Sequence, residues 1–117
     1  MNKADNESVL SAVKRAKNIL DKEEKASGKI KGKVNEKYFT SEDETALYNI
    51  ITQNADEIIS LANSRDYNSA LAQLNIFEQP LNNYLDNVTI NADDANVRAN
   101  RYKILASVRD IFEAVAL

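Results

Sequence analysis

YLDNVTINADDANVRANRYKIL, residues 84–105, is the stretch that decides the fold, because it predicts a short extended turn followed by a long amphipathic helix. Beyond Val97, apolar residues recur at spacings of three, four and seven: Ile104, Leu105, Val108, Ile111, Phe112 and Val115. This periodicity places them on one stripe of a helix. So long a stripe needs several partner helices, which the upstream sequence must supply.

The composition predicts one all-α domain over residues 1–117. The chain has 117 residues, 44% of them hydrophobic, with only two Gly and one Pro, which suits a helical bundle better than a β-sandwich. It contains no Cys and no His, which argues against disulfides, zinc sites and His-based hydrolases. No apolar run approaches the roughly 20 residues of a membrane span, and no signal peptide follows Met1. We therefore expect a cytoplasmic protein with no membrane partner.

The charge is uneven along the chain. Residues 1–34 carry nine Lys and Arg against five Asp and Glu, whereas residues 35–117 carry six against thirteen. A basic end can attract nucleic acid, although a Lys-rich end is more often a solvated helix face and loop. We expect Lys29–Lys33 (KIKGK) to form a mobile loop, and a tolerated surface insertion explains it more simply than phosphate contact does.

Three helical regions are expected before the last helix. The first begins near Ser8 and stops at Gly28. The second begins at Ser41, which fits a capping box with Glu44. The third begins at Asp66. Their expected buried faces are Val9, Leu10, Val13, Ala16, Ile19 and Leu20; then Leu47, Ile50, Ile51, Ile58 and Leu61; then Ala70, Leu71, Leu74 and Phe77.

Pro80 divides the third region. It suits a first helical turn, so we expect a break at Glu78 or Gln79 and a short helix from Pro80 to about Leu85. Residues 88–90 are strand-like but too short for a sheet, and Asn91 or Asp93 is expected to cap the final helix. The prediction is a single bundle of four to five helices.

The sequence carries no motif for catalysis. It lacks a glycine-rich phosphate loop, a nucleophile elbow and a metal-ligand cluster of known spacing. Asp86, Asp93 and Asp94 could suggest a cation site, but adjacent acids before a helix are more often caps. We therefore predict no catalytic residue and no metal ligand.

Two sets of cations are candidates for phosphate contact. Lys14, Arg15 and Lys17 lie on about one turn of the first helix, and Arg98 and Arg101 lie three apart on the last. For the two later arginines a structural tie to Asp86, Asp93 or Asp94 is the favoured interpretation.

Aromatic residues could stack on unpaired RNA bases. Most of the eight fall on apolar stripes, where core packing explains them. Tyr38 and Phe39, beside the basic loop, are the best candidates for stacking.

Residues 84–94 and 98–105 resemble the C-terminal anticodon-binding domain of bacterial glycyl-tRNA synthetase beta subunits, a helical DALR-type domain shared with arginyl-tRNA synthetases. The resemblance covers nearly the whole chain. Upstream matches follow in order: Lys14-Arg15 with Asn18-Ile19-Leu20, then Leu47-Tyr48, Asp66-Tyr67 and Ala70-Leu71. The sequence departs from the family pattern at Tyr84-Leu85 and Tyr102, where packing is preserved, and Lys29–Lys33 lies outside that pattern.

The resemblance implies a tRNA-binding domain that supports ATP-dependent attachment of glycine to its tRNA. It implies partners: the tRNA specific for glycine, the alpha subunit and the remainder of beta in an α2β2 tetramer. Catalysis, with ATP and Mg²⁺, would belong to the holoenzyme, so this domain would hold no cofactor and no catalytic residue. The chain would then be an excised C-terminal fragment of a longer beta subunit, with Met1 as an addition.

The resemblance also assigns site residues. Lys14, Arg15 and Lys17 would steer the anticodon arm, while Arg98, Asn100 and Arg101 would either hold the last helix or touch RNA. Two alternatives remain open: a helical protein–protein interaction module, favoured by exposed apolar residues, and the equivalent domain of an arginyl-type synthetase. The nucleotides that are read and the role of residues 29–33 stay undetermined by the sequence.

Overall fold

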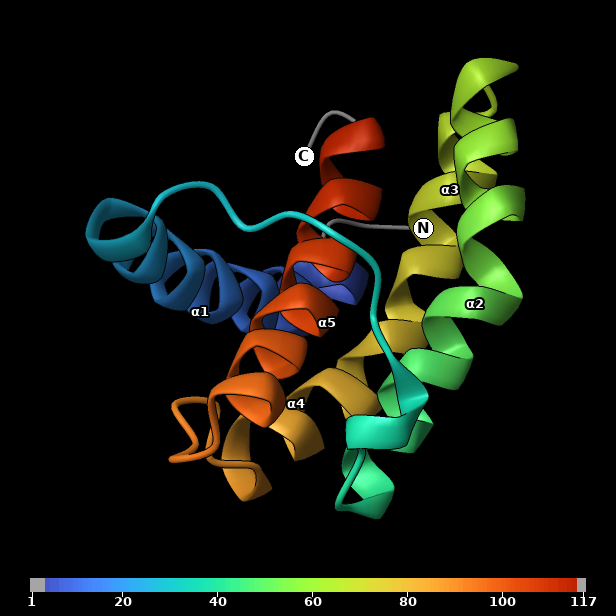
Figure 1. Cartoon of the computed structure of the whole chain (residues 1–117). Coiled ribbons are helices and arrows are strands. Elements are labelled where there is room, and N and C mark those ends of the chain that lie inside the picture. The colour runs from blue at the N-terminus through green and yellow to red at the C-terminus, as the bar shows by residue number, and fades with distance from the viewer. Residues whose placement is uncertain (1–3, 116–117) are drawn as a thin grey trace.

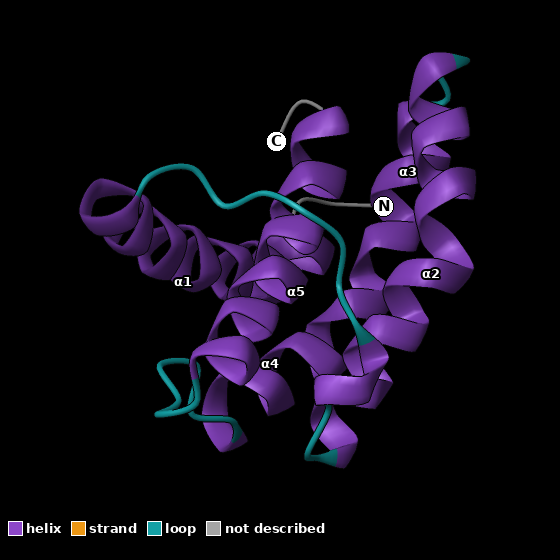
Figure 2. Ribbon diagram, viewed as in Figure 1, coloured by secondary structure: helices purple, strands orange, loops and turns teal. Residues whose placement is uncertain are grey.

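The all-α prediction is confirmed. The computed structural model describes residues 4–115, which form helices and loops without any strand (Figures 1 and 2). The five α-helices are α1 (Ala4–Ser27), α2 (Glu42–Asn63), α3 (Tyr67–Leu74), α4 (Glu78–Asn87) and α5 (Ala95–Ala114), and the two short 3₁₀ segments are η1 (Glu36–Tyr38) and η2 (Asn75–Phe77). None of the described helices combines the length and the apolar character that crossing a membrane requires.

Helix α5 is the central element of the bundle. It packs against both α1 and α2, and α4 contacts the same two helices (Figure 1). All six residues of the predicted stripe are buried: Ile104, Leu105, Val108, Ile111 and Phe112 on α5, and Val115 at its C-cap. The ring of Phe112 meets Phe77 edge to face, with ring centroids 5.8 Å apart. The stripe is therefore a packing surface, as its periodicity predicted.

Helix α1 begins four residues before the predicted start at Ser8. It buries Val9, Ala12, Val13, Ala16 and Leu20. The prediction that Leu10 is buried was wrong: its side chain is 37% exposed, because it lies next to the stripe that these residues form. The stop at Gly28 is confirmed, since this residue has φ +89° and its N–H donates to the Glu24 carbonyl.

Helix α2 starts with the predicted capping box. The Glu44 N–H donates to Ser41 Oγ, and the Ser41 N–H donates to the Glu44 carboxylate. Leu47, Ile51 and Ile58 are buried, while Ile50 and Leu61 are partly buried against the same core.

The break before α4 comes earlier than predicted. Asp66 caps α3 as expected, by accepting from the Ser69 N–H. The chain then tightens into η2, and α4 begins at Glu78 and extends to Asn87, two residues beyond the predicted end. Pro80 therefore lies within the first turn of α4, where its missing N–H breaks no intrahelical bond.

The turn into α5 is extended and partly anchored in the core. Val88 and Ile90 are buried without joining a sheet. The predicted caps Asn91 and Asp93 were wrong. Asp94 is the N-cap, because its carboxylate accepts from the N–H groups of Asn96 and Val97.

Candidate nucleic-acid interface

The first predicted cationic set lies on the outer side of α1. Lys14 and Arg15 are exposed and Lys17 is half-buried. Arg15 Nη2 is 3.2 Å from Asp86 Oδ1 near the end of α4, with side chains 49% and 60% exposed. An ion pair so exposed contributes little to stability, so Arg15 can leave it at small cost.

Arg101 is held inside the domain. Its Nε donates to Glu44 Oε2 at 3.2 Å, its Nη1 to the Thr89 carbonyl at 2.6 Å, and its Nη2 to Thr40 Oγ1 at 2.8 Å. The predicted partners Asp86, Asp93 and Asp94 were wrong, because the guanidinium points across the bundle to α2. Arg101 thus ties α5 to the start of α2 and to the turn before α5.

Glu44 is the carboxylate that pairs with Arg101, and the sequence analysis did not identify it as that partner. It is fully buried, and Oε1 accepts from the N–H groups of Thr40 and Ser41 and from the Ser41 hydroxyl. Burial alone would raise the pKa of Glu44, but the hydrogen bonds from Arg101, Thr40 and Ser41 outweigh it and hold the pKa below its ordinary value. Glu44 is therefore ionised at neutral pH.

Tyr84 extends this buried network. Its hydroxyl donates to the Arg101 carbonyl at 2.9 Å. Burial, followed by the nearby Glu44 carboxylate, strongly raises the pKa of Tyr84. The phenol is a neutral hydrogen-bond donor that joins α4 to α5.

Arg98 and Asn100 are also bonded within the domain. Arg98 Nη1 donates to the carbonyls of Ala92 and Asp93 at 2.8 and 3.2 Å, which closes the turn before α5. Buried Asn100 accepts from the Asn35 N–H at 2.7 Å and donates to the Asn35 carbonyl at 3.1 Å. The candidates on α5 thus position neighbouring segments, whereas Lys14 and Arg15 on α1 are exposed.

Residues 28–35, here called the basic segment, connect α1 to η1 and run across α5 (Figure 1). At its start, the Ile30 N–H donates to Glu24 Oε2 at 3.1 Å. Glu24 is itself paired with Arg109 of α5 at 3.1 Å. At its end, Asn100 holds Asn35. The predicted loop is confirmed, and its mobility stays a prediction.

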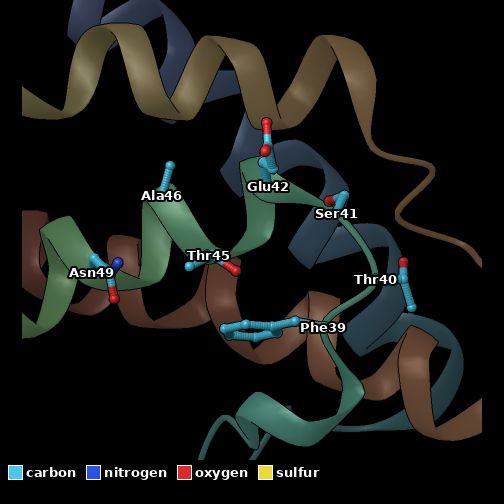
Figure 3. Close-up of a pocket in the computed structure, with 7 residues that line it drawn as sticks. All are labelled: Phe39, Thr40, Ser41, Glu42, Thr45, Ala46 and Asn49. Carbon is cyan, nitrogen blue, oxygen red and sulfur yellow. The ribbon is translucent and has the colours of Figure 1, made fainter.

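An open hollow lies beside the first turns of α2, lined by Phe39, Thr40, Ser41, Glu42, Thr45, Ala46 and Asn49 (Figure 3). The Phe39 ring is half-buried and meets Tyr48 edge to face, with centroids 5.5 Å apart. Tyr38 is also half-buried, with Lys37 Nζ 5.2 Å from its ring centroid. Tyr67 is exposed, and the sequence analysis did not single it out as a candidate for stacking. The hollow combines a ring with hydroxyl and amide groups that can hydrogen-bond.

The described residues hold no group of three or more Asp and Glu placed to bind a metal ion. The exposed side chains of the described residues include the cations Lys14 and Arg15 and the aromatic ring of Tyr67. Such groups bind phosphates and bases by charge and stacking.

The chain matches the family model described as the DALR anticodon binding domain over residues 9–116. It is 43% identical over 108 residues to the glycine–tRNA ligase beta subunit of Pseudomonas fluorescens (strain Pf0-1), covering 92% of this chain and 15% of that protein. It is 41% identical over 106 residues to the beta subunit of Pseudomonas entomophila (strain L48), covering 91% of this chain and 15% of that protein. The chain thus spans about 15% of the length of these relatives. No solved structure matches it significantly.

Proposed function

The chain belongs to the DALR anticodon binding domain family, and from this premise we propose that it binds the anticodon arm of a glycine-accepting tRNA as one domain of a glycine–tRNA ligase beta subunit. The observation that carries the proposal is identity of about 40% to such subunits over more than nine-tenths of the chain. The domain supports ATP-dependent attachment of glycine without contributing a catalytic residue.

The proposal includes the rest of the assembly. The partners are the alpha subunit and the remainder of beta in an α2β2 tetramer in the cytoplasm, and ATP and Mg²⁺ act elsewhere in that holoenzyme. The matched relatives are each named as a glycine–tRNA ligase beta subunit, which supports the beta part of this assignment.

The proposed tRNA contacts are Lys14, Arg15 and Lys17 of α1. Exposure of the first two and the weak surface pair of Arg15 support direct contact with phosphates. Arg98, Asn100 and Arg101 act instead as positioning residues, because their polar atoms are engaged by Ala92, Asn35 and Glu44. They hold the turn, the basic segment and the start of α2 where RNA meets them.

Binding of the 117-residue chain to labelled glycine-accepting tRNA at several salt concentrations tests this function. We expect salt-sensitive binding that weakens when the anticodon is replaced. Lys14→Ala with Arg15→Ala should reduce the slope of log affinity against log salt by about 0.7–0.9 for each phosphate that the variant no longer neutralises. The matched control is Lys22→Ala with Lys25→Ala, which removes two exposed charges of the same helix. No salt-sensitive binding by the unaltered chain contradicts the function, and equal slopes for both double variants contradict the α1 assignment.

A further inference from the structure

The basic segment places several lysines on one side of α5. Lys29, Lys31 and Lys33 are exposed, and they alternate along a chain that runs over this helix. Lys103 of α5 joins them, because a Cβ built on Gly32 would lie 3.3 Å from Lys103 Nζ. A cation from the last helix therefore adds to those of the connecting segment.

A small recess lies between the basic segment and α5. It is lined by Glu23, Ser27, Gly28, Lys29, Ile30, Lys31, Ala99, Tyr102 and Lys103. Glu23 is the one carboxylate of this lining. Three ammonium groups and one carboxylate give the lining a net positive charge.

The backbone of the segment is hydrogen-bonded to the bundle near both of its ends, on either side of Lys31 and Lys33. The Glu24 carboxylate accepts a hydrogen bond from the Ile30 N–H, and the Asn100 side chain makes two hydrogen bonds to the backbone of Asn35. The Ile30 and Val34 side chains also pack against the core. Holding a cationic segment before a ligand arrives lowers the entropy cost of binding.

Acidic groups limit where an anion can sit. The neighbouring groove, lined by Asp21, Glu24, Lys29, Arg109, Asp110 and Glu113, contains four carboxylates. Lys29 borders both this groove and the recess, and its charge acts on Glu24. Lys31, Lys33 and Lys103 are the cations of this region that do not line the acidic groove.

We propose that Lys31, Lys33 and Lys103 form a second RNA-contact site, which binds phosphate groups of the tRNA backbone apart from the cations of α1. Lys14 precedes the end of α1 by 13 residues, about 20 Å along the helix axis, so the basic segment begins about that far from the first cations of α1. The inference rests on the proposed tRNA-binding function. Because lysines recognise phosphate as point charges, this site adds affinity without reading sequence.

The test compares two charge-matched triple variants of the chain. Lys31→Gln, Lys33→Gln and Lys103→Gln together remove the proposed phosphate-binding charges. Lys22→Gln, Lys25→Gln and Arg65→Asn remove three exposed cations elsewhere, and Asn suits position 65 because its φ is +66°. Each is titrated against glycine-accepting tRNA and against the same tRNA with an altered anticodon, and circular dichroism verifies helix content.

The site variant should reduce the magnitude of the slope of log affinity against log salt by about 2–3 for both tRNAs alike, since each of the three phosphates that is no longer neutralised accounts for about 0.7–0.9. The control variant should not change the slope, and replacing the three lysines by Arg should restore it. If the triple variant loses helix content, Lys31→Gln alone should still lower the slope by about 0.7–0.9.

Two outcomes separate the inference from the function on which it rests. If the unaltered chain binds tRNA with salt sensitivity while the site variant keeps the same slope, the inference is overturned and the function stands. A slope that falls equally in both triple variants also overturns it, because general charge then explains the effect. If the unaltered chain binds no tRNA, both fail.

Discussion

Glu44 performs two structural tasks with one carboxylate. It completes the capping box of α2 and neutralises the buried guanidinium of Arg101. None of the buried side-chain nitrogen and oxygen atoms in the described part of the chain lacks a hydrogen-bond partner. A buried charge is tolerated when it is paired this fully. Removing one partner is costly, because the other charge then stays buried without a counter-charge.

The first prediction concerns this pair. Glu44→Gln should lower the free energy of unfolding by about 3 kcal/mol, because Arg101 stays buried without a counter-charge. Adding Arg101→Met should recover part of this decrease. Urea unfolding of both single variants and the double variant measures the coupling. Strictly additive decreases would mean that the two side chains do not depend on each other.

The second prediction is the pH dependence of the same pair. The folded-state pKa of Glu44 lies below its ordinary value of 4.5, so its stabilising contribution is complete above about pH 4.5 and is lost as the pH falls through the folded value. The difference in unfolding free energy between the unaltered chain and Glu44→Gln should therefore shrink in acid. Glu24, whose pKa is also lowered, titrates equally in both proteins and so cancels. A constant difference down to about pH 2 contradicts the assignment.

Helical spacing alone could have identified which of these residues are buried. Glu44 precedes Leu47 by three residues and Ile51 by seven, and Arg101 precedes Leu105 by four, so each extends a predicted stripe. Their pairing could not be predicted in the same way. Spacing says which face of a helix a residue occupies, and 57 residues separate these two along the chain.

At the scale of elements, local hydrogen-bonding chemistry made several helix ends predictable. Gly28, Ser41 and Asp66 each act within one turn of their own helix, so no tertiary contact is needed to recognise them. The change from α3 to α4 was placed too late because Pro80 dominates the sequence signal. The chain turns earlier, at η2, where Phe77 enters the core beside Phe112.

The third prediction distinguishes two adjacent acids at the start of α5. Asp94→Ala should cost about 1 kcal/mol of stability, because it leaves the N–H groups of Asn96 and Val97 without their acceptor. Asp93→Ala is the matched control. Arg98 contacts the Asp93 carbonyl and not its carboxylate, so this change should have little effect. Thermal unfolding of both variants measures the difference, and equal destabilisation by each contradicts the capping assignment.

At the scale of the molecule, the fold separates structural cations from outward-facing ones. Arg101 and Arg98 join elements, while α1 and the basic segment carry exposed cations. The charge excess of residues 1–34 predicted a basic end. That the basic segment crosses α5 and gains Lys103 depends on tertiary packing, which a charge count along the chain does not contain.

The last prediction uses the contact between α1 and α4. Asp86 pairs with Arg15, and a phosphate that binds Arg15 must displace this carboxylate. Asp86→Asn should therefore tighten tRNA binding about two- to fivefold, the factor that corresponds to a surface pair worth up to about 1 kcal/mol. Unfolding free energy should change by less than about 1 kcal/mol, because both side chains are exposed. Asp56→Asn, an exposed acid of α2, controls for the change in net charge. Equal tightening by both variants would show a general charge effect, and unchanged affinity in Asp86→Asn would remove Arg15 from the RNA interface.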